Sequence, residues 1–379
     1  MPAASILIKP TSSNCNIDCS YCFYKKLCRT RESYSHGRMS EETLEALVKN
    51  AMDYGQGLVS FAFQGGEPML AGPDFFRLAV SLQKKYAKKG LVIENTIQTN
   101  GTLIDDEWAQ FFAKEDFLVG VSLDGPKKLH DSCRKSAGGG GTFSLVMNGI
   151  STLKKYKVRT NIATVITEEI SYKASYLYKF YKRNNFEYVQ VIPCMGNTWE
   201  TGGDIRAAEN EFSVRPLSYG RFLCELFDLW YDDFISGDDM EIRTFSNYAQ
   251  LAAGFAAEEC GMNGKCTCYF AVEADGSVYP CDFYCTDDYR LGSVHEPFSE
   301  LVSSKCAQDF VHGSDLVSED CRACPYLRLC HGGCTHFREP QSHLNYFCKG
   351  YKMFFEHCME RINNLGKMVR ENVGRRDNR

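Results

Sequence analysis

Residues 4–24 read ASILIKPTSSNCNIDCSYCFY, and this stretch decides how the rest of the chain is interpreted. Its apolar run at residues 5–8 predicts a short buried strand. Cys15, Cys19 and Cys22 follow with the spacing C-x3-C-x2-C, so we expect them in the loop that leaves this strand. Three thiolates can bind three irons of a 4Fe–4S cube and leave the fourth iron open, as catalytic metal sites require. The alternative is a structural zinc ion whose fourth ligand is a distant Cys or His.

Short apolar runs alternate with helix-like patterns through the first half of the chain. Strands are predicted at residues 5–8, 58–63, 91–98, 117–123, 159–167 and 188–192. Helices are predicted between them, at residues 40–54, 74–89, 104–113, 143–156 and 172–184. This alternation indicates an α/β protein of parallel βαβ units, with the carboxyl ends of the strands on one face. Six strands favour a partial (β/α)6 TIM-like barrel over a complete eight-stranded one.

The composition is that of a globular protein with a large core: 379 residues, 44% hydrophobic and 24% charged. The net charge of −5 gives no basic excess of the kind that binds nucleic acid or an anionic membrane surface. No apolar run is long enough for a transmembrane helix, and the start lacks the pattern of a signal peptide. Nineteen cysteines without an export signal argue against a disulfide framework. We therefore expect a cytoplasmic protein with metal-bound thiolates.

The distribution of the cysteines predicts a second region. Seven of the 19 lie in residues 1–259, and twelve lie from Cys260 onward. This later region has too few long apolar segments for a large core, so a small domain held together by metal clusters is expected. We place the barrel and a bridging helix (216–236) in residues 1–236, and the small domain with its C-terminal helix in residues 237–379. The segment 196–216 is predicted to be a loop over the barrel mouth, and residues 369–379 a fraying end.

The motif around Cys15, Cys19 and Cys22, with Tyr21 before and Phe23 after the third cysteine, resembles the radical S-adenosylmethionine (SAM) superfamily. That family's fold is a partial (β/α)6 barrel. Residues 64–68 (QGGEP) follow a predicted strand and resemble the family's GGE motif, whose backbone receives the amino group of SAM. Glycine is suited to this because it lets a backbone approach a ligand closely. The resemblance implies SAM contacts at Tyr21, Gly66, Ser122, Arg134 and Met195. Residues 98–100 (QTN) are interpreted either as loop caps or as contacts to SAM or substrate.

The C-terminal cysteines have spacings that resemble the SPASM domain, which carries auxiliary iron–sulfur clusters. One set is Cys266-x9-Gly276-x4-Cys281, and the other is Cys321-x2-Cys324-x5-Cys330-x3-Cys334 followed by Cys348. With Cys260 they make eight thiolates, enough for two clusters, and spacing alone leaves their pairing open. The resemblance implies Cys260, Cys266, Cys281 and Cys334 for the first auxiliary cluster, and Cys321, Cys324, Cys330 and Cys348 for the second. Two zinc sites are the alternative, and Cys268 is a weaker candidate in place of Cys266.

Nearly the whole chain resembles the anaerobic sulfatase-maturating enzymes, which oxidise a Cys or Ser of a sulfatase to Cα-formylglycine. The resemblance is carried by residues 8–10 (IKP), 22–24 (CFY), 61–68 (FAFQGGEP), 98–105 (QTNGTLID), 260–264 (CGMNG) and 279–284 (YPCDFY). Residues 138–141 and 197–206 are not matched. The resemblance implies SAM and three 4Fe–4S clusters as cofactors. It also implies an unfolded or nascent sulfatase polypeptide as substrate, a flavodoxin- or ferredoxin-type electron donor, and a monomer.

Asp282 is the predicted catalytic base. It directly follows the predicted ligand Cys281 and is flanked by Phe283 and Tyr284. Burial beside aromatic rings and an anionic cluster is expected to raise the pKa of this carboxyl and therefore its basicity. From the residues alone, a surface or helix-capping aspartate is an equal alternative, and the family resemblance favours the base.

Three other functions are consistent with parts of the sequence. Another SPASM-type peptide maturase, which forms thioethers or epimerises residues, would share every cluster motif. A non-catalytic iron–sulfur electron carrier would lack a reason for the open-site triad and the GGE motif. A zinc-based interaction protein would use the same cysteines for structure alone.

Overall fold

The computed structural model describes residues 3–196 and 208–377, with the side chains of residues 374–377 left out of the description. The chain divides into two compact units. The first unit consists of Met1–Leu123, Lys127–Asn161 and Thr267–Val311. The second consists of Asp124–Pro126, Ile162–Cys266 and His312–Arg379. Each unit is described by itself.

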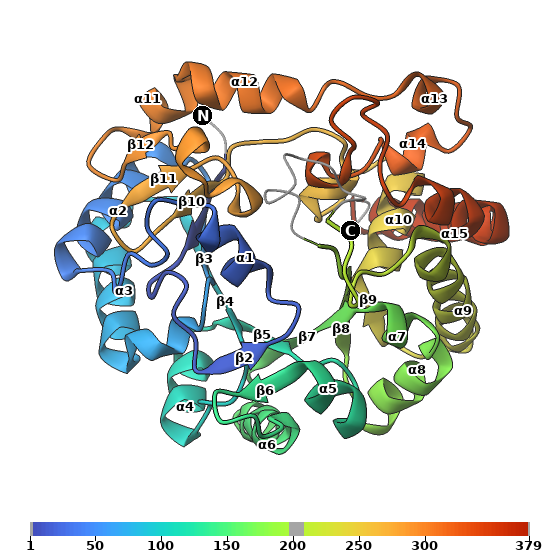
Figure 1. Ribbon diagram of the computed structural model, residues 1–379, viewed down its shortest axis with the longest axis horizontal. Coiled ribbons are helices and arrows are strands. Elements are labelled where there is room, and N and C mark those ends of the chain that lie inside the picture. Colours follow the sequence, from blue (N-terminus) through green and yellow to red (C-terminus); the bar gives the residue numbers. More distant parts are fainter. Residues whose placement is uncertain (1–2, 197–207, 378–379) are drawn as a thin grey trace. The chain divides into compact units, whose positions relative to one another are not determined.

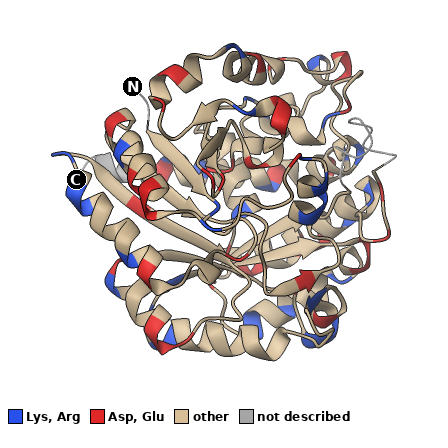
Figure 2. Ribbon diagram, turned by 60° about the vertical axis from the view of Figure 1, so that its left-hand side comes forward, with Lys and Arg blue, Asp and Glu red and all other residues tan. Residues whose placement is uncertain are grey.

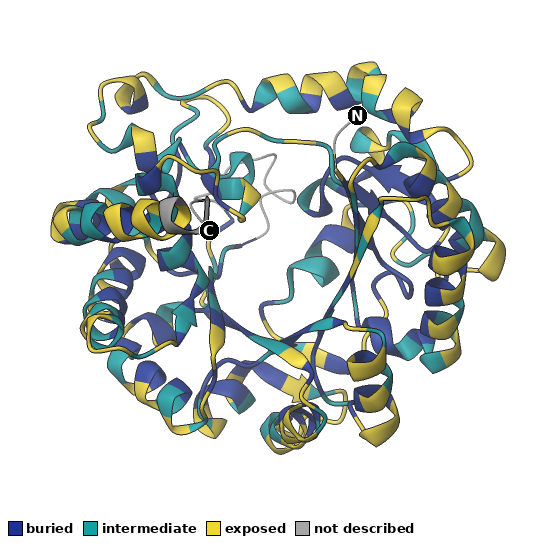
Figure 3. Ribbon diagram, turned by 180° about the vertical axis from the view of Figure 1, so that it is seen from behind, coloured by how far each residue is buried: buried dark blue, intermediate teal, exposed yellow. Residues whose placement is uncertain are grey.

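The first unit is built on a mostly parallel sheet with the strand order β12-β11-β10-β1-β3-β4-β5 (Figure 1). Four strands are parallel neighbours: β1 (Ala4–Ile8), β3 (Leu58–Phe63), β4 (Val92–Thr99) and β5 (Leu118–Ser122). Between them the chain forms α2 (Glu41–Tyr54), α3 (Pro73–Tyr86) and α4 (Asp106–Lys114). Ser40 caps α2 by accepting a hydrogen bond from the backbone N–H of Thr43. The helices turn buried faces inward and exposed faces to solvent (Figure 3).

The sheet of the first unit is completed by strands from the cysteine-rich part of the sequence. β10 (Phe270–Val272) pairs in parallel with β1, so that Ile8 stands beside Val272. β11 (Ser277–Tyr279) turns back antiparallel to β10, and β12 (Gly292–Ser293) pairs with β11. The remaining elements of this segment are η4 (Asp282–Tyr284), η5 (Asp287–Tyr289), α11 (Phe298–Ser303) and α12 (Lys305–Gly313). Residues 281–285 are thereby fixed close to the end of β1.

A small separate sheet holds the loop of Cys15, Cys19 and Cys22 against residues 134–136. β2 (Ile17–Cys19) pairs antiparallel with β6 (Arg134–Ser136), and Cys19 stands opposite Arg134. Three helices flank this pair along the chain: α1 (Phe23–Arg29), α5 (Lys127–Cys133) and α6 (Phe143–Lys155). The glycine run at residues 138–141 is a turn that brings Gly141 back to Lys135 in a β-bridge. No phosphate-binding role is needed to explain these glycines.

The second unit contains β7 (Arg159–Ile166) from Ile162 onward and the parallel strand β8 (Tyr188–Pro193), with β9 (Glu241–Ile242) beside β8. Its helices include α7 (Glu168–Ser171), α8 (Ala174–Arg183), α9 (Pro216–Ile235), α10 (Arg243–Ala253), α13 (Glu319–Arg322) and α14 (Leu327–Cys330). The long helix α15 (Cys348–Asp377) packs against α9 and α10. Gly220 and Gly350 meet at the α9–α15 contact, where a Cβ on Gly220 would lie 2.7 Å from the Cα of Gly350. Glycine at both positions lets the two helices approach this closely.

The predicted α/β fold with parallel strands is confirmed, and all six predicted strands form with ends within about two residues of the prediction. Residues 369–379 were expected to fray, and this was wrong for residues 369–377, which continue α15. Residues 378–379 lie outside the described residues. Most of the segment predicted to cover the barrel mouth, residues 197–207, lies outside the described residues. The domain boundary at residue 236 stays a prediction.

The surface of each unit carries both signs of charge. Acidic and basic side chains are interspersed along the helices (Figure 2). Several form exposed ion pairs within one helix, such as Lys127 with Asp131 and Lys305 with Asp309. Of the helices described, none combines the length and the apolar character that a bilayer crossing requires.

Candidate active site and cluster sites

The cysteine triad lies in the loop that leaves β1 and in the turn before α1. Cys15 is exposed, while Cys19 and Cys22 are partly buried. Burial is the largest cause that raises the pKa of the Cys15 thiol, and the neighbouring Cys22 also raises it. Burial likewise raises the pKa of Cys22, which the Arg134 guanidinium partly offsets. A cluster binds thiolates, so cluster binding at these cysteines has to displace their protons.

Arg134 is the side chain that reaches the triad from β6. It is 7% exposed, and its Nη1 atom lies 3.8 Å from the sulfur of Cys19. Its guanidinium also lies over the ring of Tyr21, 5.4 Å from the centroid. Two predicted SAM contacts are therefore neighbours at the cluster loop. On β5, Ser122 accepts a hydrogen bond from Gln98 of β4 at 3.1 Å. Met195 belongs to the second unit and lies two positions before the residues that are not described.

The GGE motif is packed against the backbone of the cysteine loop. The N–H of Gly66 donates to the carbonyl of Ser12, and the N–H of Glu67 donates to the carbonyl of Asn14, both at 2.8 Å. A Cβ on Gly66 would lie 2.0 Å from the oxygen of Asn14. The glycine is thus required by the loop that carries Cys15. Contact with SAM at Gly66 stays a prediction.

Glu67 is a buried carboxylate that ties the end of β3 to the end of β4. It is fully buried and accepts hydrogen bonds from the N–H of Asn100 (2.8 Å), the hydroxyl of Thr99 (2.8 Å) and the N–H of Met69 (3.1 Å). Burial raises the pKa of Glu67 to about 7, although these hydrogen bonds act to lower it. Asn100 also reaches the sulfur of Cys15 at 3.7 Å. Residues 98–100 therefore support the cluster loop, which favours the structural interpretation of Thr99 and Asn100.

Asp282 is buried at the first position of η4, and hydrogen-bonding groups surround its carboxylate. Its Oδ2 atom accepts a hydrogen bond of 2.6 Å from the hydroxyl of Tyr24, which in turn accepts one of 2.9 Å from Gln64. Its Oδ1 atom lies 2.8 Å from Nζ of Lys9. Both oxygens of this carboxylate therefore have a buried partner. The surface or helix-capping alternative for Asp282 does not fit this burial.

The charges behind Asp282 differ from those expected from the sequence. Lys9 is 1% exposed and lies 3.4 Å from the carboxylate of Glu273, which also binds Arg31 at 2.6 Å. Although burial acts to lower it, Asp282, Cys285 and Glu273 raise the pKa of Lys9 well above its usual value. Burial acts to raise the pKa of Glu273, but the charges of Lys9 and Arg31 lower it to about 2. Asp282 therefore faces a buried cation, in addition to the predicted aromatic neighbours.

Lys9, Glu273 and Tyr24 were not predicted as site residues, although a signal for them existed. Lys9 follows the apolar strand at residues 5–8, and Glu273 follows the apolar run at residues 270–272. Charged residues directly after buried parallel strands gather at the same edge of a sheet. That Lys9 and Glu273 lie together can be inferred only once β10 is known to pair with β1. This pairing joins residues more than 260 positions apart.

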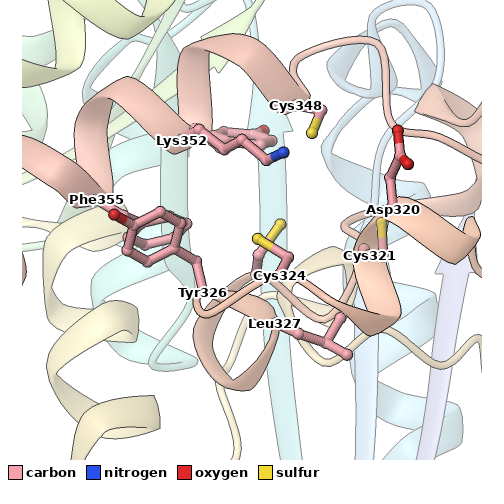
Figure 4. A pocket seen from close by; sticks show the side chains of 11 residues that line it. Asp320, Cys321, Cys324, Tyr326, Leu327, Cys348, Lys352 and Phe355 are labelled. Atoms are coloured by element: carbon pink, nitrogen blue, oxygen red, sulfur yellow. The ribbon is translucent and has the colours of Figure 1, made fainter.

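The second auxiliary cluster has a complete set of thiols in the second unit. Cys321, Cys324, Cys330 and Cys348 line one pocket together with Lys352 and Asp320 (Figure 4). About 320 Å³ of space free of atoms lies at this pocket, open solvent included. Figure 4 shows the sulfurs of Cys324 and Cys348 and the amine of Lys352 turned toward this space. Burial, together with a smaller contribution from the other three thiols of the set, raises the pKa of Cys330 to about 12. Four converging thiols are the donor set of a 4Fe–4S cluster.

Three of the four predicted ligands of the first auxiliary cluster also come together in the second unit. Burial raises the pKa of Cys334 to about 12, with further contributions from Cys260 and Cys266. The sulfur of Cys266 lies 3.2 Å from the hydroxyl of Thr335, next to Cys334. The fourth predicted ligand, Cys281, belongs to the first unit, where its sulfur lies 3.1 Å from the hydroxyl of Tyr269. Cys266 is thus preferred over Cys268, whose sulfur lies 3.9 Å from the Ala307 carbonyl.

The zinc alternatives receive no support from the side-chain positions. Among the described residues, no group of three or more His, Cys, Asp or Glu side chains is arranged to hold a single metal ion. Several remaining cysteines are buried in apolar or hydrogen-bonded surroundings, as expected for core thiols: Cys28, Cys133, Cys194, Cys285 and Cys358.

Comparison with known protein families assigns the two parts of this site. The radical SAM superfamily matches residues 10–172, and the SPASM iron–sulfur cluster-binding domain matches residues 260–325. The protein is therefore a radical SAM enzyme with a SPASM domain, and its cofactors are SAM and iron–sulfur clusters.

Comparison with individual relatives shows to which family of radical SAM enzymes the chain belongs. A cysteine-type anaerobic sulfatase-maturating enzyme of Clostridium perfringens is 43% identical over 98% of this chain and 100% of its own length. A serine-type enzyme of Bacteroides thetaiotaomicron is 33% identical over 93% of this chain and 88% of its own. The solved structure of native anSMEcpe with bound AdoMet and Cp18Cys peptide has a TM-score of 0.90, with 97% of this chain and 100% of that chain covered. This chain belongs to the family of anaerobic sulfatase-maturating enzymes.

Proposed function

We propose that this protein converts a cysteine of a sulfatase polypeptide to Cα-formylglycine, with Asp282 as the base. The observation that carries the proposal is the buried carboxylate of Asp282, held by the hydroxyl of Tyr24 at Oδ2 and by the ammonium of Lys9 at Oδ1. Cysteine is preferred over serine as substrate because cysteine-type relatives are 41–43% identical and a serine-type relative is 33% identical.

The conversion needs an electron donor, a hydrogen acceptor, a base and an electron acceptor. In overall balance, the cysteine CH2–SH group and one water give an aldehyde, hydrogen sulfide, two protons and two electrons. Cys15, Cys19 and Cys22 would hold the catalytic cluster, which together with SAM would supply the one-electron chemistry that removes a Cβ hydrogen. The auxiliary clusters supply an acceptor for the second electron.

Residues of this chain accept the substrate proton and bind SAM. The carboxylate of Asp282 accepts the thiol proton, while Tyr24 donates to its other oxygen and fixes its orientation. Gln64 fixes the hydroxyl of Tyr24 in turn. The ammonium of Lys9, 2.8 Å from Oδ1, holds the other carboxylate oxygen in position. SAM is held by Gly66, Ser122 and Arg134, with Tyr21 and Met195 as further contacts.

The experiment that tests this function is mass spectrometry of a peptide from a sulfatase active-site motif, after anaerobic incubation with SAM and a reductant. Loss of the sulfur and appearance of an aldehyde is the expected result. A serine version of the same peptide is expected to react more slowly. A thioether or an epimerised product would contradict the proposal. A flavodoxin- or ferredoxin-type protein is the proposed donor, and it should replace the chemical reductant.

A further inference from the structure

Arg338 is a buried arginine at the centre of the loops that carry the C-terminal cysteines. The Arg338 residue is 5% exposed. The guanidinium donates hydrogen bonds of 2.7–3.4 Å to backbone carbonyls alone, those of Gly264, Ser314, Leu316, His331, Gly332 and Gly333. One side chain thereby links the loop before Cys266, the segment before Cys321 and the turn between Cys330 and Cys334.

The charge of Arg338 has no carboxylate partner among the residues that the structure describes. A buried cation without an anion is costly, so a negative group is expected close by. The predicted pocket of the second auxiliary cluster provides such a place, because Gly332 lines it together with Cys321, Cys324, Cys330 and Cys348. The carbonyl of Gly332 accepts a hydrogen bond of 3.2 Å from Nε of Arg338, and a Cβ on Gly332 would lie 3.3 Å from Nη2 of Arg338. The guanidinium therefore lies directly behind the wall of this pocket.

A cluster bound by four thiolates carries two negative charges when oxidised and three when reduced. A nearby positive charge stabilises the reduced form more than the oxidised form and therefore raises the reduction potential. Lys352 also lines the pocket, but it is partly exposed and its charge is screened by water (Figure 4). The buried charge of Arg338 acts in a medium of lower dielectric constant, where its effect is larger.

We propose that Arg338 is the internal counter-charge of the cluster held by Cys321, Cys324, Cys330 and Cys348. Its charge favours the reduced state of that cluster, so that this cluster readily accepts one electron. No bond forms or breaks and no proton moves in this step. The functional use of the electron rests on the proposed formylglycine chemistry, in which the electron comes from the oxidised substrate.

The test is an anaerobic redox titration of the full-length chain, followed by EPR spectroscopy and iron analysis. Cys15, Cys19 and Cys22 are replaced by Ala in every sample to remove the signal of the catalytic cluster. The signal that disappears on Cys348→Ala identifies the second auxiliary cluster. Arg338→Gln is expected to lower the equilibrium constant for reduction about tenfold or more, which is ~59 mV for one electron. Arg338→Lys keeps the charge and is expected to change it less than about threefold.

A matched control removes the same charge from the surface. Lys265 is adjacent to Cys266 in sequence, and its side chain is 77% exposed. Lys265→Gln is expected to change the reduction equilibrium by less than about twofold because water screens exposed charges. A shift as large as that of Arg338→Gln would contradict the importance of burial and overturn the proposal.

A second variant tests the charge while the hydrogen bonds of Arg338 remain. Asn345 is 3% exposed and donates to the Gly332 carbonyl that also accepts from Arg338. Asn345→Asp places a carboxylate there and is expected to lower the reduction equilibrium constant, as Arg338→Gln does. The proposal is overturned if the variants keep their auxiliary iron with an unchanged potential. It is also overturned if Arg338→Lys loses iron as Arg338→Gln does, because the hydrogen bonds alone would then matter. The titration uses no substrate, so its outcome is independent of the peptide assay.

Discussion

Arg134 and Cys19 stand directly opposite each other in the antiparallel pair of β2 and β6, with Nη1 of the arginine 3.8 Å from the thiol sulfur. The pairing explains why residues more than a hundred positions apart act at one site. It also places the guanidinium where it touches both the cluster loop and the ring of Tyr21.

Arg134→Met is expected to weaken SAM binding about 10- to 100-fold, because a hydrogen bond to a charged group contributes about 1.5–3 kcal/mol. Iron content should stay normal, since the three cysteines are unchanged. Equilibrium binding of SAM to the reconstituted protein, with iron analysis, checks this. Lys135→Met, on the exposed neighbour in β6, is the control and should bind SAM normally. Normal SAM binding by Arg134→Met would remove Arg134 from the SAM site.

Gly66→Ala is expected to lower the iron content from about twelve to about eight atoms per chain, because the added Cβ displaces the loop that carries Cys15. A role in SAM binding alone would instead leave the iron content unchanged. Gly313→Ala is a suitable control because nothing lies within 4 Å of its Cβ position. Iron and sulfide analysis after anaerobic reconstitution distinguishes the two cases.

Glu67 should make the stability of the protein depend on pH. Its pKa is raised to about 7 in the folded protein from 4.5. The folded state therefore holds more protons than the unfolded state between these values, and the free energy of unfolding falls as pH rises from about 4.5 to about 7. The total fall from this residue is about 3 kcal/mol.

Glu67→Gln should abolish that part of the pH dependence. It should also lower the free energy of unfolding by the same amount at every pH, because an amide group then faces the N–H of Asn100. Anaerobic urea unfolding at pH 5 and pH 8 measures it. Glu107→Gln, which changes an exposed carboxylate of α4, serves as the control. An unchanged difference between the two pH values in Glu67→Gln would show that Glu67 does not titrate there.

Tyr24→Phe removes the hydroxyl that donates to Asp282 and accepts from Gln64. Formylglycine formation is expected to fall about 10-fold or more, since a hydrogen bond to a charged group is lost. SAM cleavage should persist. Tyr34→Phe, an exposed tyrosine of the same segment, should leave both rates unchanged. Chromatographic measurement of 5′-deoxyadenosine and aldehyde product together checks the prediction.

Local patterns in the sequence predicted the strands at residues 58–63 and 188–192, because apolar runs between polar helices have few other structures open to them. The cysteine spacings predicted the thiols that converge around Cys330. The strands β2, β6 and β10 were not predicted, since each is three residues long and forms through pairing with a distant segment. The same pairings bring Arg134 to Cys19 and Lys9 to Asp282, so the charges around both sites could not be worked out from local sequence.

The central claim is that Asp282 accepts the substrate proton, and Asp282→Asn tests it most directly. The variant keeps the shape of the side chain and removes its basicity. Its ratio of formylglycine to 5′-deoxyadenosine should fall by about 10²–10⁴-fold, because general base catalysis contributes that much, while SAM cleavage and iron content remain. Asp288→Asn, on an exposed carboxylate of the same segment, should keep the wild-type ratio. A wild-type ratio in Asp282→Asn with all clusters present would contradict the account.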